Sequence, residues 1–133
     1  MFHAKEYVKA ESLEQAYELN QKRSNVLAGG MMWLKMSSGN RNTVIDLSGL
    51  GLDQIEETED EFRIGCMCSL RQLELHKGLN QYFDGAFREC TRWIVGTQFR
   101  NSATVGGSVF GRFGFSDILT CMMVLDSYVE LYK

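Results

Sequence analysis

Two glycine pairs constrain this chain more than any other feature of its sequence. One ends an apolar run at residues 25–28 and reads Ala-Gly-Gly at residues 28–30; the other reads Thr-Val-Gly-Gly at residues 104–107. Because glycine has no Cβ, its backbone amide can approach an anion that a larger residue would hold away. The two pairs therefore predict two turns that bind one extended, phosphate-bearing ligand.

Composition and charge exclude several classes of protein. The 133 residues fit one domain of ordinary size, and 44% hydrophobic with 23% charged residues is typical of a packed globular core. The formal net charge is -3, and the charges form no basic stripe that would follow a nucleic-acid backbone. We therefore expect a folded domain that does not bind nucleic acid.

The apolar stretches are interrupted and fall short of the roughly 20 residues that a membrane span needs. The N-terminus lacks the basic and then apolar pattern of a secretory signal, so we expect a cytoplasmic protein without a membrane span. The cysteines are few and have no ligand-like spacing, which favours buried or half-buried free thiols over disulfides or a metal site. They are Cys66, Cys68, Cys90 and Cys121.

The first part of the chain predicts a small βαβ subdomain, which we assign to residues 1–55. Ser12 begins a Ser-Leu-Glu-Gln capping box, so a helix is expected from residue 13 to about residue 22. Apolar and alternating runs predict the strands around it, and a short helical piece follows the first glycine pair. The strands are expected at residues 5–10, 26–28 and 43–47, and the short piece at residues 33–36.

Residues 56–133 are assigned to the first part of a larger subdomain. An acidic hairpin at residues 56–61 leads to a strand at residues 62–66, and a second capping box at Ser69 opens a helix that runs through about residue 76. Apolar spacing then predicts one helix over residues 80–95, stopped by Gly96. A buried helix capped by Asp117 is expected at residues 117–125, and an unpaired strand at residues 127–133.

Three stretches, taken in order, carry a family resemblance. Residues 26–30 look like a flavin loop, residues 44–47 look like the strand after it, and residues 95–107 look like the signature Gly-x-x-Gln-x-Arg-Asn-x-x-Thr-Ile-Gly-Gly. The whole chain thus resembles the N-terminal part of the FAD-binding medium subunit, or domain, of the xanthine dehydrogenase and carbon monoxide dehydrogenase family of molybdenum hydroxylases. Asp117 stands at that family's spacing from the signature.

The resemblance implies an α+β fold of the PCMH/vanillyl-alcohol-oxidase type, with two subdomains, FAD in the cleft between them, and an incomplete C-terminus. It also implies a flavin component of an oxidoreductase. The partners would be a molybdopterin-binding large subunit and a [2Fe-2S] small subunit, and electrons would pass through FAD to NAD or another electron acceptor. Strand edges and apolar residues left open by the missing half predict self-association, as a homo-oligomer, in isolation.

The resemblance also assigns the FAD contacts. Backbone amides can meet the two charges of a buried pyrophosphate without adding net charge, a threonine hydroxyl can donate, and a carboxylate can accept from a ribose or an adenine amine. The residues are Ala28, Gly29, Gly30, Met31 and Met32 in the first loop, Thr104, Val105, Gly106, Gly107 and Ser108 in the second, and Asp117. No catalytic side chain and no metal ligand is assigned.

The sequence departs from the family pattern and leaves alternatives open. Met31-Met32-Trp33 stands where the family has polar residues, and Phe113-Gly114 stands near the family's Ser-Pro. A flavin-free or truncated relative that acts as an assembly or interaction module is one alternative. A flavoenzyme of similar fold, such as the cell-wall precursor reductases, is another. Arg100 is interpreted as a structural anchor of its loop rather than a phosphate ligand.

Overall fold

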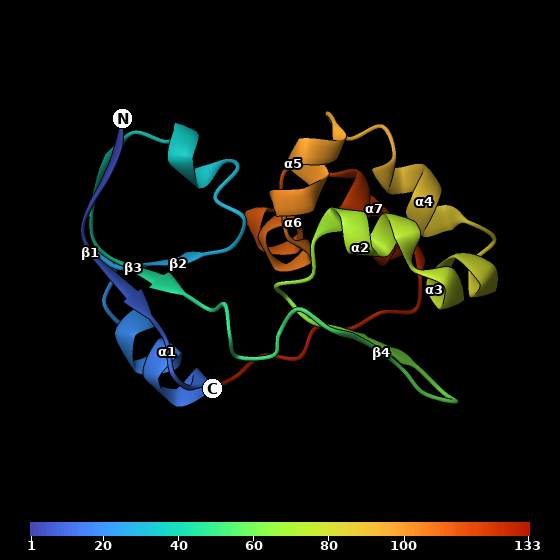
Figure 1. Ribbon diagram of the computed structural model, residues 1–133, viewed down its shortest axis with the longest axis horizontal. Helices are drawn as coiled ribbons and strands as arrows, with labels where there is room; N and C mark the ends of the chain where they lie inside the picture. The colour runs from blue at the N-terminus through green and yellow to red at the C-terminus, as the bar shows by residue number, and fades with distance from the viewer.

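The computed structural model describes residues 1–133, and its first part is built on a three-stranded parallel sheet (Figure 1). The strands are β1 (Phe2–Lys9), β2 (Val26–Ala28) and β3 (Gly39–Asp46), in the order β1-β3-β2. Helix α1 (Leu13–Asn20) joins β1 to β2, and the short helix η1 (Leu34–Met36) follows β2. Ala10, Ala16 and Ile45 form the small core of this part.

The predicted βαβ unit is confirmed, with shifted boundaries. The first strand starts at Phe2 rather than residue 5, and the helix ends at Asn20 rather than residue 22. Ser12 caps the helix as expected, because its Oγ accepts a hydrogen bond from the Gln15 amide at 3.1 Å. Parallel pairing of β2 with β3 delivers the first glycine pair to the carboxyl edge of the sheet.

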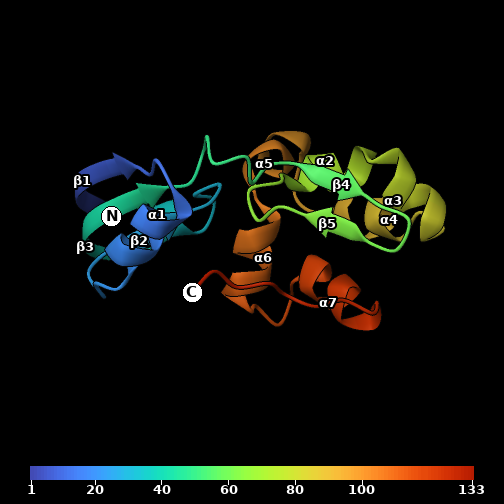
Figure 2. The ribbon, with the colours of Figure 1, turned by 90° about the horizontal axis from the view of Figure 1, so that it is seen from below.

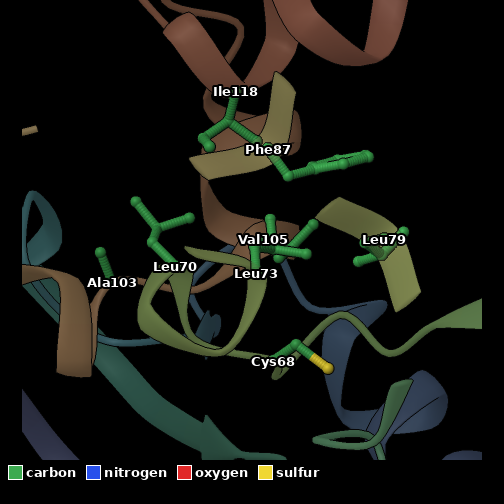
Figure 3. Packing of buried hydrophobic residues seen from close by; sticks show 8 residues of the cluster. All are labelled: Cys68, Leu70, Leu73, Leu79, Phe87, Ala103, Val105 and Ile118. Carbon is green, nitrogen blue, oxygen red and sulfur yellow. The ribbon is translucent and has the colours of Figure 1, made fainter. Parts of the chain in front are cut away.

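The second part consists of a hairpin and six short helices around a larger core. The hairpin pairs β4 (Ile55–Glu57) with β5 (Phe62–Ile64) in antiparallel register. The helices are α2 (Leu70–Leu75), α3 (Lys77–Tyr82), α4 (Ala86–Thr91), α5 (Thr97–Ser102), α6 (Val105–Gly111) and α7 (Asp117–Val124). Figure 3 shows the buried cluster that they share, which consists of Cys68, Leu70, Leu73, Leu79, Phe87, Ala103, Val105 and Ile118.

The second capping box is confirmed at the start of α2. The amide of Gln72 donates to Ser69 Oγ at 3.2 Å, and the amide of Ser69 donates to Gln72 Oε1 at 2.8 Å. Gln72 also donates through Nε2 to the carbonyl of Asp53 at 2.8 Å. This helix start therefore ties the larger core to the chain that arrives from β3.

The prediction of one helix over residues 80–95 is wrong. Asp84 and Gly85 adopt positive φ angles of 49° and 79°, so the chain breaks between α3 and α4. The cause is Asn80, which is buried: its Nδ2 donates to the His76 carbonyl at 2.8 Å, and its Oδ1 accepts from the Arg88 amide at 2.8 Å. A buried side chain that needs these partners overrides the helical spacing of the apolar residues.

Gly96 does not stop a helix, because it is the N-cap of α5. Helix α7 is real, but it is not buried all round: Ile118 is buried, while Met123 and Val124 are 77% and 81% exposed. Its N-cap is Ser116, whose Oγ accepts from the Leu119 amide at 3.2 Å, and Asp117 is the first residue of the helix.

Residues 127–133 form no strand, contrary to the prediction. The segment returns along the molecule toward the first part of the chain (Figure 2). The hydroxyl of Tyr128 donates to Glu61 Oε2 at 2.8 Å, and the ring of Tyr132 lies edge-on to Tyr17 at 6.1 Å between centroids. Side chains rather than a backbone ladder hold this segment, which explains why its alternating pattern did not produce a strand.

No helix of the protein combines the length and the apolar character that crossing a membrane requires. The four cysteines are free, as expected, although Cys66 is exposed rather than buried.

Candidate cofactor site

The two glycine pairs lie against each other. A Cβ built on Gly29 would lie 2.6 Å from Thr104 Oγ1, and one built on Gly30 would lie 1.6 Å from the carbonyl oxygen of Ser102. Figure 1 shows the corresponding segments, with the chain after β2 turning beside the junction of α5 and α6. Two segments far apart in the sequence therefore meet at one place, and only glycine allows this approach.

The first turn presents backbone amides without partners. The amides of Gly29, Gly30, Met31 and Met32 donate to no acceptor within the chain. Met31 adopts the left-handed conformation, with φ at 61°, which is uncommon for a residue with a side chain. Successive amides in a turn that contains such a residue form a concave anion-binding surface. This turn has the donors that a phosphate needs.

The second glycine segment behaves differently from the expectation. Residues 105–111 form helix α6 rather than a loop, and the amides at its start already have acceptors. The Val105 amide donates to the Cys68 carbonyl at 2.8 Å, the Gly106 amide to the Cys66 carbonyl at 2.9 Å, and the Ser108 amide to the Thr104 carbonyl at 3.0 Å. The predicted supply of free amides from this segment is therefore wrong.

Thr104 provides a hydroxyl at the contact between the two segments. Its Oγ1 accepts from the Gly107 amide at 3.2 Å and so caps α6, while its own hydrogen donates to no group in the chain. The residue is 6% exposed and its hydroxyl faces Gly29. The hydroxyl is thus positioned by the helix start and is available to a ligand held on the first turn.

Val105 and Gly106 serve the packing of this segment. Val105 is buried in the larger core. A Cβ on Gly106 would lie 2.7 Å from both the Cβ and the carbonyl oxygen of Cys66, so this glycine permits a close approach of the chain that leads into α2. Gly107 is exposed at the surface beside Thr104.

Of the residues Met31-Met32-Trp33, which depart from the family pattern, the last two have different surroundings. Met32 packs against the larger core, although it belongs to the first part of the chain. Trp33 is 49% exposed, and its ring contacts those of Phe99, Phe113 and Phe115. Sequence patterns did not predict this aromatic contact, because Trp33 lies more than sixty residues before its partners in the chain.

Asp117 lies apart from the other predicted contacts. It lines an open hollow of about 510 Å³ between α4 and α7, together with Cys90, Trp93 and Cys121. The lining of this hollow includes none of the other predicted residues. The carboxylate of Asp117 is exposed and has no hydrogen-bond or ion-pair partner within the chain. Burial, and after it the neighbouring Cys121, raises the pKa of the Cys90 thiol well above its usual value.

Arg100 forms a buried ion pair, which confirms its structural interpretation. Its Nε donates to Glu74 Oε2 at 2.8 Å, and its Nη1 donates to the Ile94 carbonyl at 3.1 Å. Burial acts to raise the pKa of Glu74, but hydrogen bonds from Arg100 and Arg71 outweigh it and hold that pKa below its usual value. The sequence did not identify Glu74 as the partner, because 26 residues separate the two.

These features place the chain among the α+β domains with a backbone turn suited to bind a phosphate-bearing ligand. The chain belongs to the family described as the FAD binding domain in molybdopterin dehydrogenase, whose family model matches residues 2–133. The predicted family and fold class are therefore confirmed, and FAD is the cofactor of the family.

Two curated proteins are similar to the chain over nearly its whole length. The chain is 26% identical over 131 residues to the alpha subunit of the 6-hydroxypseudooxynicotine dehydrogenase complex of Paenarthrobacter nicotinovorans, covering 93% of this chain and 44% of that subunit. It is 25% identical over 126 residues to the uncharacterized protein YgfM of Escherichia coli strain K12, covering 92% of this chain and 47% of YgfM. The chain thus spans about half the length of the curated relatives it matches.

Solved structures show the same fold. The Cu,Mo-CO dehydrogenase in its cyanide-inactivated form matches with a TM-score of 0.80 at 20% identity, over 90% of this chain and 44% of that one. Carbon monoxide dehydrogenase from Hydrogenophaga pseudoflava matches with a TM-score of 0.68 at 24% identity, over 78% of this chain and 38% of that one. Quinoline 2-oxidoreductase from Pseudomonas putida 86 matches with a TM-score of 0.66 at 15% identity, over 81% of this chain and 38% of that one.

Proposed function

We propose that the chain binds FAD as the flavin component of a molybdenum-hydroxylase-type oxidoreductase in the cytoplasm. Its partners in this proposal are a molybdopterin-binding large subunit and a [2Fe-2S] small subunit, and its FAD passes electrons from the clusters to NAD or another acceptor. Family membership supports the cofactor, and the relative that is a subunit of a dehydrogenase complex supports a role within an assembly. The observation that carries the proposal is the set of unpartnered amides at residues 29–32.

The donor set fits a diphosphate. A buried phosphate requires hydrogen bonds from several directions, and consecutive backbone amides supply them at fixed positions without a competing counter-ion. The Thr104 hydroxyl faces the same turn. In this proposal residues 29–32 and Thr104 hold the diphosphate. Ala28 ends the strand that positions the first turn, and Val105 and Gly106 anchor the second segment to the larger core and to Cys66.

The remaining predicted contacts complete the proposed site. Gly107 is exposed next to Thr104, and the Ser108 hydroxyl donates to the Thr104 carbonyl at 3.0 Å, so both shape the surface around the threonine. A dinucleotide is an extended ligand, so the unpaired carboxylate of Asp117 is proposed as an acceptor for a ribose or adenine rather than as part of the phosphate contact. When bound, FAD supplies the redox chemistry, and the chain supplies binding and orientation.

Titration of the purified chain with FAD tests the proposal. We expect saturable binding at one site and competition by ADP, because ADP carries the same diphosphate. A sample denatured after purification should release flavin. If neither FAD nor ADP binds, the proposal is wrong. Size-exclusion chromatography of the same sample tests the expected self-association.

A flavin-free assembly module is the second candidate. The observation that favours it is the apolar sequence of the first turn, in which Met32 joins the larger core and offers no side-chain donor to a phosphate. This candidate predicts that the chain forms a stable complex with the large and small subunits whether or not FAD is present, and that FAD adds no thermal stability to the chain. Cofactor-dependent stability would exclude it, since a ligand that binds the folded state stabilises that state.

A further inference from the structure

Four aromatic rings from both parts of the chain gather in one cluster. Trp33 lies 6.4 Å from Phe99, 5.7 Å from Phe113 and 5.8 Å from Phe115, measured between ring centroids. Phe113 and Phe115 stack on each other at 5.2 Å with an interplanar angle of 12°. We call these four rings the aromatic cluster.

The aromatic cluster adjoins the turn with the free amides. Trp33 follows that turn directly in the sequence. Phe113 and Phe115 follow α6, whose capping residue Thr104 lies against Gly29. The first turn and the cluster are therefore two neighbouring surfaces of one place in the fold, one polar and one aromatic.

The cluster is open on one side. Trp33, Phe113 and Phe115 are 49%, 39% and 67% exposed. Exposed aromatic rings next to a polar binding surface are typical of ligand sites, since a planar ligand ring covers them with a favourable stacking geometry. A dinucleotide held by its diphosphate at residues 29–32 carries two planar rings on flexible arms, so one of them can reach a side chain that follows the turn.

We propose that Trp33, supported by Phe113 and Phe115, stacks against the isoalloxazine ring of the bound dinucleotide. This inference rests on the proposed function. A half-exposed platform suits the isoalloxazine rather than the adenine, because the redox ring has to remain reachable for an external electron donor and acceptor. The platform supplies the aromatic contact in a turn whose own side chains offer no polar group to the ligand.

The experiment measures FAD and ADP affinity in the full chain and in two variants, Trp33→Leu and Trp33→Phe. ADP carries the diphosphate and the adenine but lacks the isoalloxazine. We expect Trp33→Leu to weaken FAD binding about tenfold, as an aromatic pair contributes, and to leave ADP binding unchanged. Tyr82→Leu is the matched control, because Tyr82 is an exposed aromatic residue of α3 that belongs to no proposed FAD contact.

The emission of bound flavin is the second readout. An indole in contact with isoalloxazine quenches flavin fluorescence by donating an electron to the excited ring, which phenylalanine does not do. Trp33→Phe keeps an aromatic ring in the cluster, so we expect it to bind FAD well and to restore the emission. The Tyr82→Leu control should remain quenched.

The outcomes separate this inference from the proposed function. If FAD binds but Trp33→Leu changes neither its affinity nor its emission, the stacking inference is wrong and the proposed function stands. If Trp33→Leu weakens the binding of FAD and of ADP equally and lowers the melting temperature, the aromatic cluster only joins the two parts of the chain. The stacking inference is then wrong as well. If the wild-type chain binds neither ligand, both proposals are wrong.

Discussion

Gly29 faces the hydroxyl oxygen of Thr104 so closely that a Cβ on the glycine would lie 2.6 Å from that oxygen. The contact joins the end of the parallel sheet to the start of α6. A neighbouring contact, between Gly30 and the carbonyl of Ser102, is closer still. Both depend on the absence of a side chain, so the geometry of the candidate site is sensitive to substitutions that add a single carbon.

Gly30→Ala should disrupt this contact. The new Cβ would lie 1.6 Å from the Ser102 carbonyl oxygen, which is backbone and cannot turn aside. The two segments have to separate, and overpacking of this kind costs about 2 kcal/mol in the free energy of unfolding. Urea denaturation measures the loss, and FAD titration should show weaker binding because the turn has moved.

Gly96→Ala is the matched control for Gly30→Ala. A Cβ at Gly96 meets no atom within 4 Å, and its φ of -143° is ordinary for alanine. We expect a loss of about 0.5–1 kcal/mol, smaller than that of Gly30→Ala, because the only cost is that alanine is a poorer helix N-cap than glycine. Equal losses in the two variants would show that the contact at Gly30 does not matter.

Thr104 can be tested by comparing a variant that lacks its hydroxyl with one that keeps it. Thr104→Val removes the hydroxyl but keeps the shape, so it removes the α6 cap, at about 1 kcal/mol of stability, together with the proposed donor. Thr104→Ser retains the hydroxyl and should keep both the cap and FAD binding. Calorimetric titration of the two variants with FAD would contradict the proposed role if Thr104→Val bound as tightly as Thr104→Ser.

The sequence predicted local structure where the signal was local. Both serines cap their helices, because each contact joins residues three apart in the chain. The box is complete only at Ser69, whereas Gln15 accepts from the amide of Glu11 rather than from that of Ser12. The signature at residues 95–107 led to the right family. It did not indicate that the amides of Val105 and Gly106 already donate to acceptors within the chain. Their acceptors are the carbonyls of Cys66 and Cys68, which only the folded chain brings close.

Long-range contacts explain the errors as well. Apolar spacing indicated one helix over residues 80–95, but the hydrogen bonds of the buried Asn80 favour a left-handed turn at Asp84 and Gly85. Alternation indicated a strand at residues 127–133, but this segment joins neither sheet and contacts the rest of the chain through the side chains of Tyr128 and Tyr132. Periodicity reports which side of a segment is apolar, and it carries no information on which partner is present.

The buried pair of Glu74 and Arg100 should make stability depend on pH. Because the pKa of Glu74 is lowered in the folded state, its contribution is complete above the ordinary glutamate pKa and is lost as the pH falls through the folded value. At pH near 7, Glu74→Gln should cost about 3 kcal/mol, since it leaves Arg100 buried without a counter-charge. The difference in the free energy of unfolding between wild type and Glu74→Gln should become smaller below about pH 4.

Glu89→Gln provides the comparison for that experiment. Glu89 pairs with Arg92 at 2.8 Å, but both side chains are largely exposed. An exposed pair contributes about 0.5 kcal/mol or less, so this variant should be close to wild type at every pH. Denaturation curves at several pH values measure the free energy of unfolding of each variant. If the difference between wild type and Glu74→Gln stayed constant with pH, a lowered pKa of Glu74 in the folded state would be contradicted.

The thiol of Cys90 should resist alkylation in the folded chain. Burial first, and the neighbouring Cys121 second, raises its pKa, so little reactive thiolate is present at pH 8. Peptide mapping after iodoacetamide treatment should find Cys90 labelled far more slowly in the native chain than in urea. Cys121→Ser removes the second cause and should speed the labelling, whereas equal rates in native and unfolded chains would exclude the raised pKa.

Asp117→Asn tests the contact proposed for the ribose or adenine. The carboxylate is exposed and unpaired, so the substitution should leave the melting temperature nearly unchanged. Loss of a charged hydrogen-bond acceptor should weaken FAD and ADP to the same extent, by about tenfold, because both ligands carry the adenosine half. Riboflavin lacks that half, and its binding should not change. If the affinity for FAD and ADP were unaltered, Asp117 would not belong to the site, because the first turn and Thr104 would hold the ligand without this carboxylate. Asp117 would then be only a residue of the hollow between α4 and α7.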